Sequence, residues 1–210
     1  MAKRTKEQAE QTREALLDAA ERVFHAKGVG RASLDDIAQE AGVTRGAVYW
    51  HFKNKGDVFT AMCDRVALPW EAMLAALAAD PGDDPVGGLI RNSVNVLTQV
   101  ANDERTMRVF EIMMFKTELC DVVAEVMEQE AERARKCRLL LEEVLHAAQA
   151  KGQMPPELDC KLAAFAANSF VVGCIREWLE LRDIDLTERA PWLMTSFFAG
   201  LRVCPAPPSH

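Results

Sequence analysis

Cationic and aromatic side chains crowd together in one short stretch near the N-terminus, VTRGAVYWHFKNKGDVF at residues 43–59. An arginine stands near its start, two lysines stand near its end, and four consecutive rings lie between them. Arginine can donate two hydrogen bonds to guanine O6 and N7, lysine neutralises phosphate, and tyrosine can reach a phosphate or stack on a sugar. These residue types at this density indicate recognition of a polyanion, and double-stranded DNA is the favoured partner.

Two short helices are needed to position these side chains. Ser33, with Asp36 three places on, predicts a capping box before LDDIAQEA, and Thr44 can cap a second helix over 45–51. The GVT turn between them is short and contains a glycine, which is typical of a helix-turn-helix. A recognition helix enters the major groove with its N-terminus first, so its leading residues meet the base edges. The residues expected to face DNA are Ser33, Thr44, Arg45, Gly46, Tyr49, Lys53 and Lys55.

The second of these helices needs support, because a seven-residue helix is not stable alone in water. We expect Val48, Trp50 and Phe52 to hold it on the rest of the domain. For any one residue, ordinary core packing or solvation explains its presence equally well. The combined order and spacing favour DNA binding over that alternative.

Apolar residues recur at helical spacing along the chain, and no strand-like alternation appears. In the first helix Leu16, Leu17, Ala20 and Phe24 predict the inner face, and Glu21 is expected on the outer one. The fold class is therefore predicted to be all-α. The expected helices cover about 7–27, 34–41, 45–51, 55–79, 86–102, 104–117, 121–150, 158–181 and 187–202.

Charge is distributed unevenly along the 210 residues, of which 49% are hydrophobic. Residues 1–60 hold ten of the 25 Lys/Arg and nine of the 32 Asp/Glu, a balance of +1, so the remainder carries −8 of the net charge of −7. A near-neutral N-terminal segment followed by an acidic remainder fits a chain in which only the N-terminal segment binds a polyanion. No run of about 18 apolar residues and no secretory leader pattern is found, so we expect a cytoplasmic protein without a membrane partner.

The cysteines and histidines lack the spacings of metal or catalytic sites. No CxxC, zinc-finger pattern, HExxH, nucleophile elbow or phosphate-binding glycine loop occurs, so no enzyme activity, metal or cofactor is expected. Free thiols are the expected state, and a redox switch is the alternative. The six cysteines are Cys63, Cys120, Cys137, Cys160, Cys174 and Cys204.

Residues 12–59, TREALLDAAERVFHAKGVGRASLDDIAQEAGVTRGAVYWHFKNKGDVF, closely resemble the DNA-binding domain of TetR-family transcriptional regulators. NDERTMRVFEIMMFKTEL (102–119) looks like the corresponding part of the AcrR-type branch, which represses tripartite drug-efflux pumps. The resemblance implies an all-helical homodimer of about nine helices per chain, and it adds His51 to the DNA contacts. It implies a helix-turn-helix domain at 1–54, a ligand-binding and dimerisation domain at 55–204 and a flexible tail at 205–210.

The eighth expected helix supports a dimer on its own residues. Between Leu162 and Trp178 almost no polar face remains, and such a helix must be covered on all sides. A partner chain is the natural cover, while complete burial inside one chain is the alternative.

Ligand-binding residues are expected where methionines gather and where polar residues interrupt apolar helices. Flexible thioethers suit varied apolar ligands, although ordinary core packing explains them too. A polar residue such as Arg176 either orients a ligand or pairs with Glu111 or Glu177. The candidates are Asn92, Val96, Met107, Phe110, Glu111, Met113, Met114, Cys137, Asn168, Val172 and Arg176.

The sequence thus predicts a repressor of a multidrug efflux-pump operon that hydrophobic, drug-like compounds release from a palindromic operator. The fourth helix, with Pro69 inside it, is the expected lever. The alternative is a related regulator of another pathway that responds to an acyl or metabolite ligand or to thiol oxidation.

Overall fold

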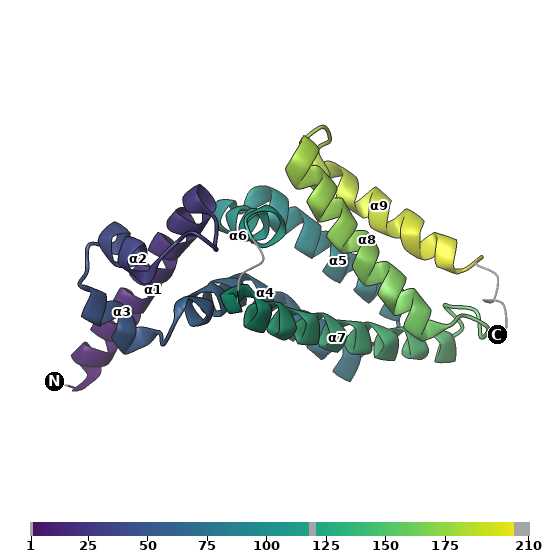
Figure 1. Cartoon of the computed structure of the whole chain (residues 1–210). Helices are drawn as coiled ribbons and strands as arrows, with labels where there is room; N and C mark the ends of the chain where they lie inside the picture. Colours follow the sequence, from purple (N-terminus) through teal and green to yellow (C-terminus); the bar gives the residue numbers. More distant parts are fainter. Residues whose placement is uncertain (1, 118–120, 204–210) are drawn as a thin grey trace. The chain divides into compact units, whose positions relative to one another are not determined.

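The computed structural model describes the backbone of residues 2–117 and 121–203 and the side chains of 6–67, 69–117 and 128–203. Cys120, Cys204 and the predicted tail lie outside these ranges. Within them the chain forms nine α-helices and no strand (Figure 1), which confirms the predicted fold class. The helices are α1 (Ala2–Lys27), α2 (Leu34–Ala41), α3 (Arg45–His51), α4 (Lys55–Ala79), α5 (Pro85–Asn102), α6 (Glu104–Phe115), α7 (Asp121–Ala150), α8 (Cys160–Leu181) and α9 (Leu186–Leu201).

The chain packs into two compact units. The first contains Met1–Ala67 and Arg108–Glu130, and the second contains Leu68–Met107 and Ala131–His210. Because α4, α6 and α7 each have residues in both units, packing does not divide the chain between residues 54 and 55. The predicted functional boundary there stays a prediction.

The core of the first unit lies between α1 and its neighbours. The predicted inner face of α1 is confirmed, since Leu16, Leu17 and Phe24 are fully buried. The ring of Phe24 packs on that of Phe59 in α4, with centroids 6.0 Å apart. Glu21 is also buried, at 2% exposure, so its expected outward placement is wrong. Its helical position, one turn from Leu17 and Phe24, places it on the same face as they are.

The second unit is built around α5, which packs mainly on α9 and also on α8. In Figure 1, α8 and α9 run side by side, and Phe170 stacks on Phe197 between them with ring centroids 4.8 Å apart. Ala163, Ala164, Ala167 and Ile175 form the inner side of α8.

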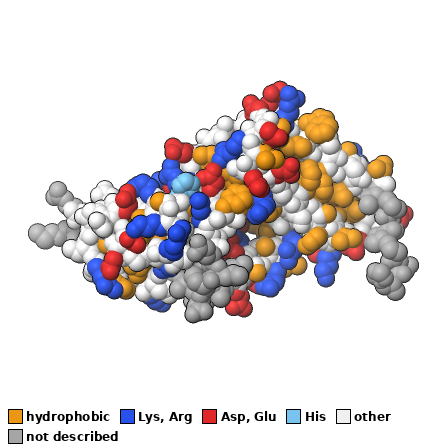
Figure 2. Space-filling model, turned by 45° about the horizontal axis from the view of Figure 1, so that its top comes forward, with side chains coloured by type: hydrophobic (Ala, Val, Ile, Leu, Met, Phe, Trp, Pro, Cys, Tyr) orange, Lys and Arg blue, Asp and Glu red, His pale blue; other side chains and the backbone are white. Residues whose placement is uncertain are grey.

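An apolar surface remains on the outer side of α8 and α9 (Figure 2). Leu162, Phe165 and Val172 of α8 are 53%, 54% and 43% exposed, and Trp192 of α9 is 68% exposed. The single chain therefore leaves this surface uncovered, and the alternative of complete burial within one chain is wrong.

By length and composition, α8 could also cross a membrane, and it is the one helix among the described residues that passes this test. A half-covered helix of a helical protein passes the same test. Lys161, Arg176 and Glu177 interrupt its outer surface.

Candidate nucleic-acid interface

Helix α3 is held on the first unit by one face only. The Thr44 hydroxyl accepts from Ala47 N–H at 3.3 Å, so the predicted N-cap is confirmed. Val48 is fully buried and Phe52 is 4% exposed, whereas Trp50 is 71% exposed. The prediction that Trp50 supports the helix is therefore wrong. Positions 48 and 52 share a face because they are one turn apart, and position 50 points the opposite way.

Helix α2 has the predicted capping box at its start. Asp36 N–H donates to Ser33 Oγ at 3.1 Å, and Ser33 N–H donates to Asp36 Oδ2 at 2.9 Å. Lys27 Nζ lies 2.7 Å from Asp36 Oδ1. The hydrogen bonds from Lys27 and then Ser33 lower the pKa of Asp36 to about 2. The helix ends at Gly42, whose φ of 67° is left-handed and turns the chain towards α3.

Arg45 stands at the exposed start of α3 and is held in place from two sides. Its Nη2 donates to the Tyr49 hydroxyl at 3.1 Å, and its Nε lies 3.1 Å from Asp35 Oδ1 in α2. The guanidinium also lies over the Tyr49 ring, 5.4 Å from its centroid. These contacts restrict the rotamers of an exposed arginine, which reduces the entropy lost on binding. Beside it, a Cβ atom at Gly46 would meet only Thr44 Oγ1, at 3.9 Å, so a duplex backbone can approach this glycine.

The two lysines after α3 occupy different surroundings. Lys53 is exposed, whereas Lys55 Nζ donates to the carbonyls of Gly30 and Ala32 at 2.9 and 2.8 Å. Lys55 thus ties the loop before α2 to the start of α4, and one of its three N–H groups is left for a phosphate. Asn54 caps α4, accepting from Asp57 N–H at 2.8 Å.

His51 ends α3 with its ring edge-on to Trp50, at 4.5 Å between centroids. Partial burial, and then the charge of Arg13, lower the pKa of His51 below its usual value. The imidazole is therefore neutral at pH 7, and any contact with a phosphate would be an uncharged N–H donation.

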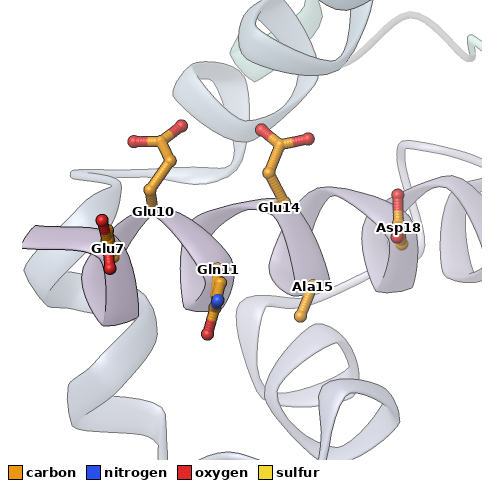
Figure 3. A pocket seen from close by; sticks show the side chains of 6 residues that line it. All are labelled: Glu7, Glu10, Gln11, Glu14, Ala15 and Asp18. Atoms are coloured by element: carbon orange, nitrogen blue, oxygen red, sulfur yellow. The ribbon is translucent and has the colours of Figure 1, made fainter. Parts of the chain in front are cut away.

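The opposite kind of surface lies on α1. Figure 3 shows an open pocket along this helix, where Glu7, Glu10, Glu14 and Asp18 project. Carboxylates repel phosphate, so this face of α1 is unsuited to DNA. The remaining lining residues are Gln11 and Ala15.

Sequence reasoning missed a network of charges within the first unit. Arg65 of α4, whose side chain is 12% exposed, lies 2.6 Å from Asp18 and 3.3 Å from both Glu14 and Glu21 of α1. Arg108 of α6 lies 3.8 Å from the same Glu21. Glu21, a charge between apolar positions of α1, was the sequence signal for it.

Two further contacts join α6 to the end of α1. His25 Nε2 lies 2.9 Å from Glu111 Oε2, and Val29 N–H donates to the Lys116 carbonyl at 2.9 Å. The C-terminal end of α6 is thus attached to the C-terminal end of α1, and α2 packs on α1.

The predicted ligand residues fall in both units. Phe110, Glu111, Met113 and Met114 belong to the first unit. The second unit holds Asn92, Val96, Met107, Cys137, Asn168, Val172 and Arg176. Most are half-buried, but Val172 and Arg176 lie exposed on the outer side of α8. Their assignment to a common ligand site stays a prediction.

The four cysteines within the described residues are thiols rather than disulfides, as expected. Cys63 and Cys160 are buried, and Cys137 and Cys174 are half-buried. Burial is the main cause that raises the pKa of Cys137, Cys160 and Cys174.

Comparison with known families gives two matches along the chain. Residues 16–62 match the bacterial regulatory proteins of the tetR family, and residues 84–202 match the C-terminal region of MAATS-type transcriptional repressors. The chain is 38% identical to the transcriptional regulator TtgR of Pseudomonas putida over 207 residues, which cover 98% of this chain and 99% of TtgR. It is 33% identical over 208 residues to the transcriptional regulator AcrR of Shigella flexneri, covering 98% of this chain and 96% of AcrR.

A solved structure agrees with these matches. The triclosan complex of SmeT, the repressor of the Stenotrophomonas maltophilia multidrug efflux pump SmeDEF, superposes with a TM-score of 0.83. The two chains are 33% identical, and the match covers 90% of this chain and 91% of SmeT.

Proposed function

Since this chain belongs to the TetR family of bacterial regulatory proteins, with a MAATS-type repressor C-terminal region, we propose that it represses a multidrug efflux-pump operon and that hydrophobic, drug-like compounds release it from DNA. That it is a DNA-binding transcriptional regulator follows from the family. The operon and the inducer are the proposal. The observation that carries it is an exposed, preorganised Arg45 on a chain that matches AcrR over nearly its whole length.

In this proposal α3 enters the major groove and Arg45 contacts guanine. Tyr49 and Thr44 contact the backbone or base edges next to it, and Lys53 neutralises phosphate. Ser33, Gly46, His51 and Lys55 complete the set, with Lys55 acting mainly on the loop that it holds. A homodimer formed through the outer side of α8 and α9 presents two α3 helices to a palindrome, with half-sites spaced by roughly 34–36 Å or a multiple.

The proposed inducer is a neutral hydrophobic compound bound in the cytoplasm, where the operator also lies. SmeT has been solved with triclosan, which is an apolar chlorinated phenol. The half-buried methionine and phenylalanine side chains of α6 suit such a compound.

The proposed coupling uses the helices that have residues in both units. A ligand that changes the packing of α4 or α6 in the second unit changes the same helices in the first unit. There, the His25–Glu111 and Val29–Lys116 contacts make α1 follow α6. A coupling of about 1–3 kcal/mol is sufficient for release, and Pro69 gives α4 a point at which to bend.

Thiol oxidation is the weaker alternative for the signal. The thiolate is the reactive form of cysteine, and burial raises the pKa of Cys137, Cys160 and Cys174. Oxidation of these thiols is therefore disfavoured relative to binding of a compound.

An electrophoretic mobility-shift assay tests the proposal with the DNA upstream of the chain's own gene and of any adjacent pump operon. We expect retardation of this DNA, no retardation of a scrambled fragment, and reversal by pump substrates. Retardation that no pump substrate reverses would refute the proposed class of inducer. Absence of retardation would refute the proposed regulation of the pump operon.

A further inference from the structure

Helix α5 presents two different faces within the second unit. One face is buried and carries Leu89, Ser93, Leu97 and Val100. The other carries Gly88, Asn92, Asn95 and Gln99. These four are spaced by four, three and four residues, which places them on one side of a helix.

This second face lies against the part of α4 that belongs to the same unit. A Cβ atom at Gly88 would meet Leu77 Cδ1 at 2.5 Å, so the Leu77 side chain lies directly over this glycine. Asn95 Nδ2 donates to Met73 Sδ at 3.6 Å. The contacts in order are Leu77 with Gly88, Met73 with Asn95, and Trp70 with Gln99.

Because the residue numbers run in opposite directions in these contacts, α4 and α5 are antiparallel. Asn92 falls between Gly88 and Asn95, so the register places it opposite the stretch of α4 between Met73 and Leu77, which includes Leu74. Leu74 is 3% exposed and offers no hydrogen bond.

The side-chain oxygen of Asn92 is buried, and no donor among the described residues reaches it. Its neighbours on the same face differ, since Asn95 donates to Met73 and Gln99 accepts from Trp70. A buried acceptor without a donor destabilises a fold, and native proteins leave few of them. A ligand that brings its own donor to this place would remove the penalty.

The second unit also contains an ion pair between α4 and α7. Glu71 Oε1 lies 2.7 Å from Arg133 Nη1, which joins α4 to α7. Burial and then Glu71 raise the pKa of Cys137, one turn beyond Arg133, so this thiol is neutral. The apolar Leu74 and the acceptor without a donor at Asn92 therefore favour a neutral, mostly apolar molecule that carries a hydrogen-bond donor.

We propose that Asn92 is the hydrogen-bond anchor of the inducer and that it selects apolar ring compounds carrying a hydroxyl group, with the hydroxyl donating to Asn92 Oδ1. This inference rests on the proposed release by hydrophobic compounds and adds the chemical feature that they must share.

Titration calorimetry of the full chain with triclosan and with its O-methyl ether tests the anchor. The two probes differ in one donor. We expect the wild-type chain to bind the phenol at least ten times more tightly than the ether. Asn92→Leu should bring the ratio of dissociation constants near one. The matched control Asn95→Leu, on the same face of α5 but already partnered, should keep the preference for the phenol.

Three results would overturn the anchor: equal binding of both probes by the wild-type chain, an unchanged ratio in Asn92→Leu, or no binding of the phenol. Asn92→Asp, which keeps an acceptor, should keep the preference and serves if the leucine variant fails to fold. Thermal melts of the free chain add a second readout, because Asn92→Leu should melt at or above the wild-type temperature. Retardation of the operator without ligand is measured separately, so failure of DNA binding is not confused with failure of the anchor.

Discussion

Arg45 and Lys55 are both cations close to the predicted DNA surface, yet the structure gives them different surroundings. Arg45 is exposed and held by Tyr49 and Asp35, with no role in the core. Lys55 bonds two backbone carbonyls of the loop before α2. Substitution of Arg45 should therefore weaken DNA recognition, whereas substitution of Lys55 should destabilise the fold.

Arg45→Ala should weaken binding to the operator by about ten- to a hundredfold and relax sequence preference, because a bidentate base contact is lost. Binding to random DNA should fall much less. Fluorescence anisotropy with both DNAs measures the difference. An equal loss on specific and random DNA would count against a base contact by Arg45.

Lys55→Met should lower the free energy of unfolding by about 2 kcal/mol, because the carbonyls of Gly30 and Ala32 lose a charged donor. Lys53→Met, the matched control at an exposed position, should leave stability unchanged. It should instead lower the slope of log affinity against log salt by about one. Urea denaturation and salt titrations separate the two effects, and a stable Lys55→Met chain would contradict the role given to Lys55.

At the scale of single helices, the capping of α2 links folding to pH. The pKa of Asp36 is about 2 in the folded chain, below its ordinary value of 3.8. A carboxylate whose pKa is depressed by folding stabilises the fold above its unfolded pKa and loses this effect as pH falls through the folded one.

Stability should therefore decline between about pH 4 and pH 2 as Asp36 is protonated, and Asp36→Asn should remove that part of the decline. Urea denaturation of both chains at several pH values, with NMR titration of the carboxyl, measures it. Parallel pH profiles of the two chains would contradict the depressed pKa.

The helices themselves could be predicted well from the sequence. Their ends follow from local signals such as Ser33, Thr44 and Asn54, and only the start of α1 departs by more than two residues. The misassigned residues depend on which face meets a neighbour. Trp50 looked like core because aromatic rings usually are, and Glu21 looked exposed because carboxylates usually are. Only the three-dimensional structure supplies Arg65 and Arg108, which accompany Glu21 inside.

Contacts between distant segments also could not be predicted from the sequence. The pairing of His25 with Glu111 joins residues 86 positions apart, and no local pattern encodes it. The unsatisfied oxygen of Asn92 depends on the register between α4 and α5, which helical periodicity alone leaves open.

At the scale of the whole molecule, the uncovered apolar surface of α8 and α9 is the feature that matters most for function. Leu162, Phe165 and Val172 lie along one side of α8, with Gly173 beside them. Large apolar side chains with small neighbours let two helices approach closely, and the proposed dimer places them against a second chain.

Phe165→Glu should give a monomer, because the dimer would have to bury a carboxylate in an apolar interface. Operator affinity should fall by at least tenfold, while weak binding to a half-site should be unchanged. Leu181→Glu, on the same helix but on another side and 57% exposed, is the matched control. Sedimentation velocity measures the oligomeric state, and a dimeric Phe165→Glu chain would contradict the proposed interface.

The left-handed turn at Gly42 bears on how repression depends on temperature. Any other residue there adds a Cβ atom at a φ of 67°, at a cost of about 1–2 kcal/mol, although the surrounding space is empty. The altered proteins should fold and bind the operator at low temperature, and they should unfold and release it at higher temperature. In a reporter assay, chains with replacements at Gly42 should therefore show heat-sensitive repression of the operator, unlike chains altered at Arg45, whose defect is the same at every temperature.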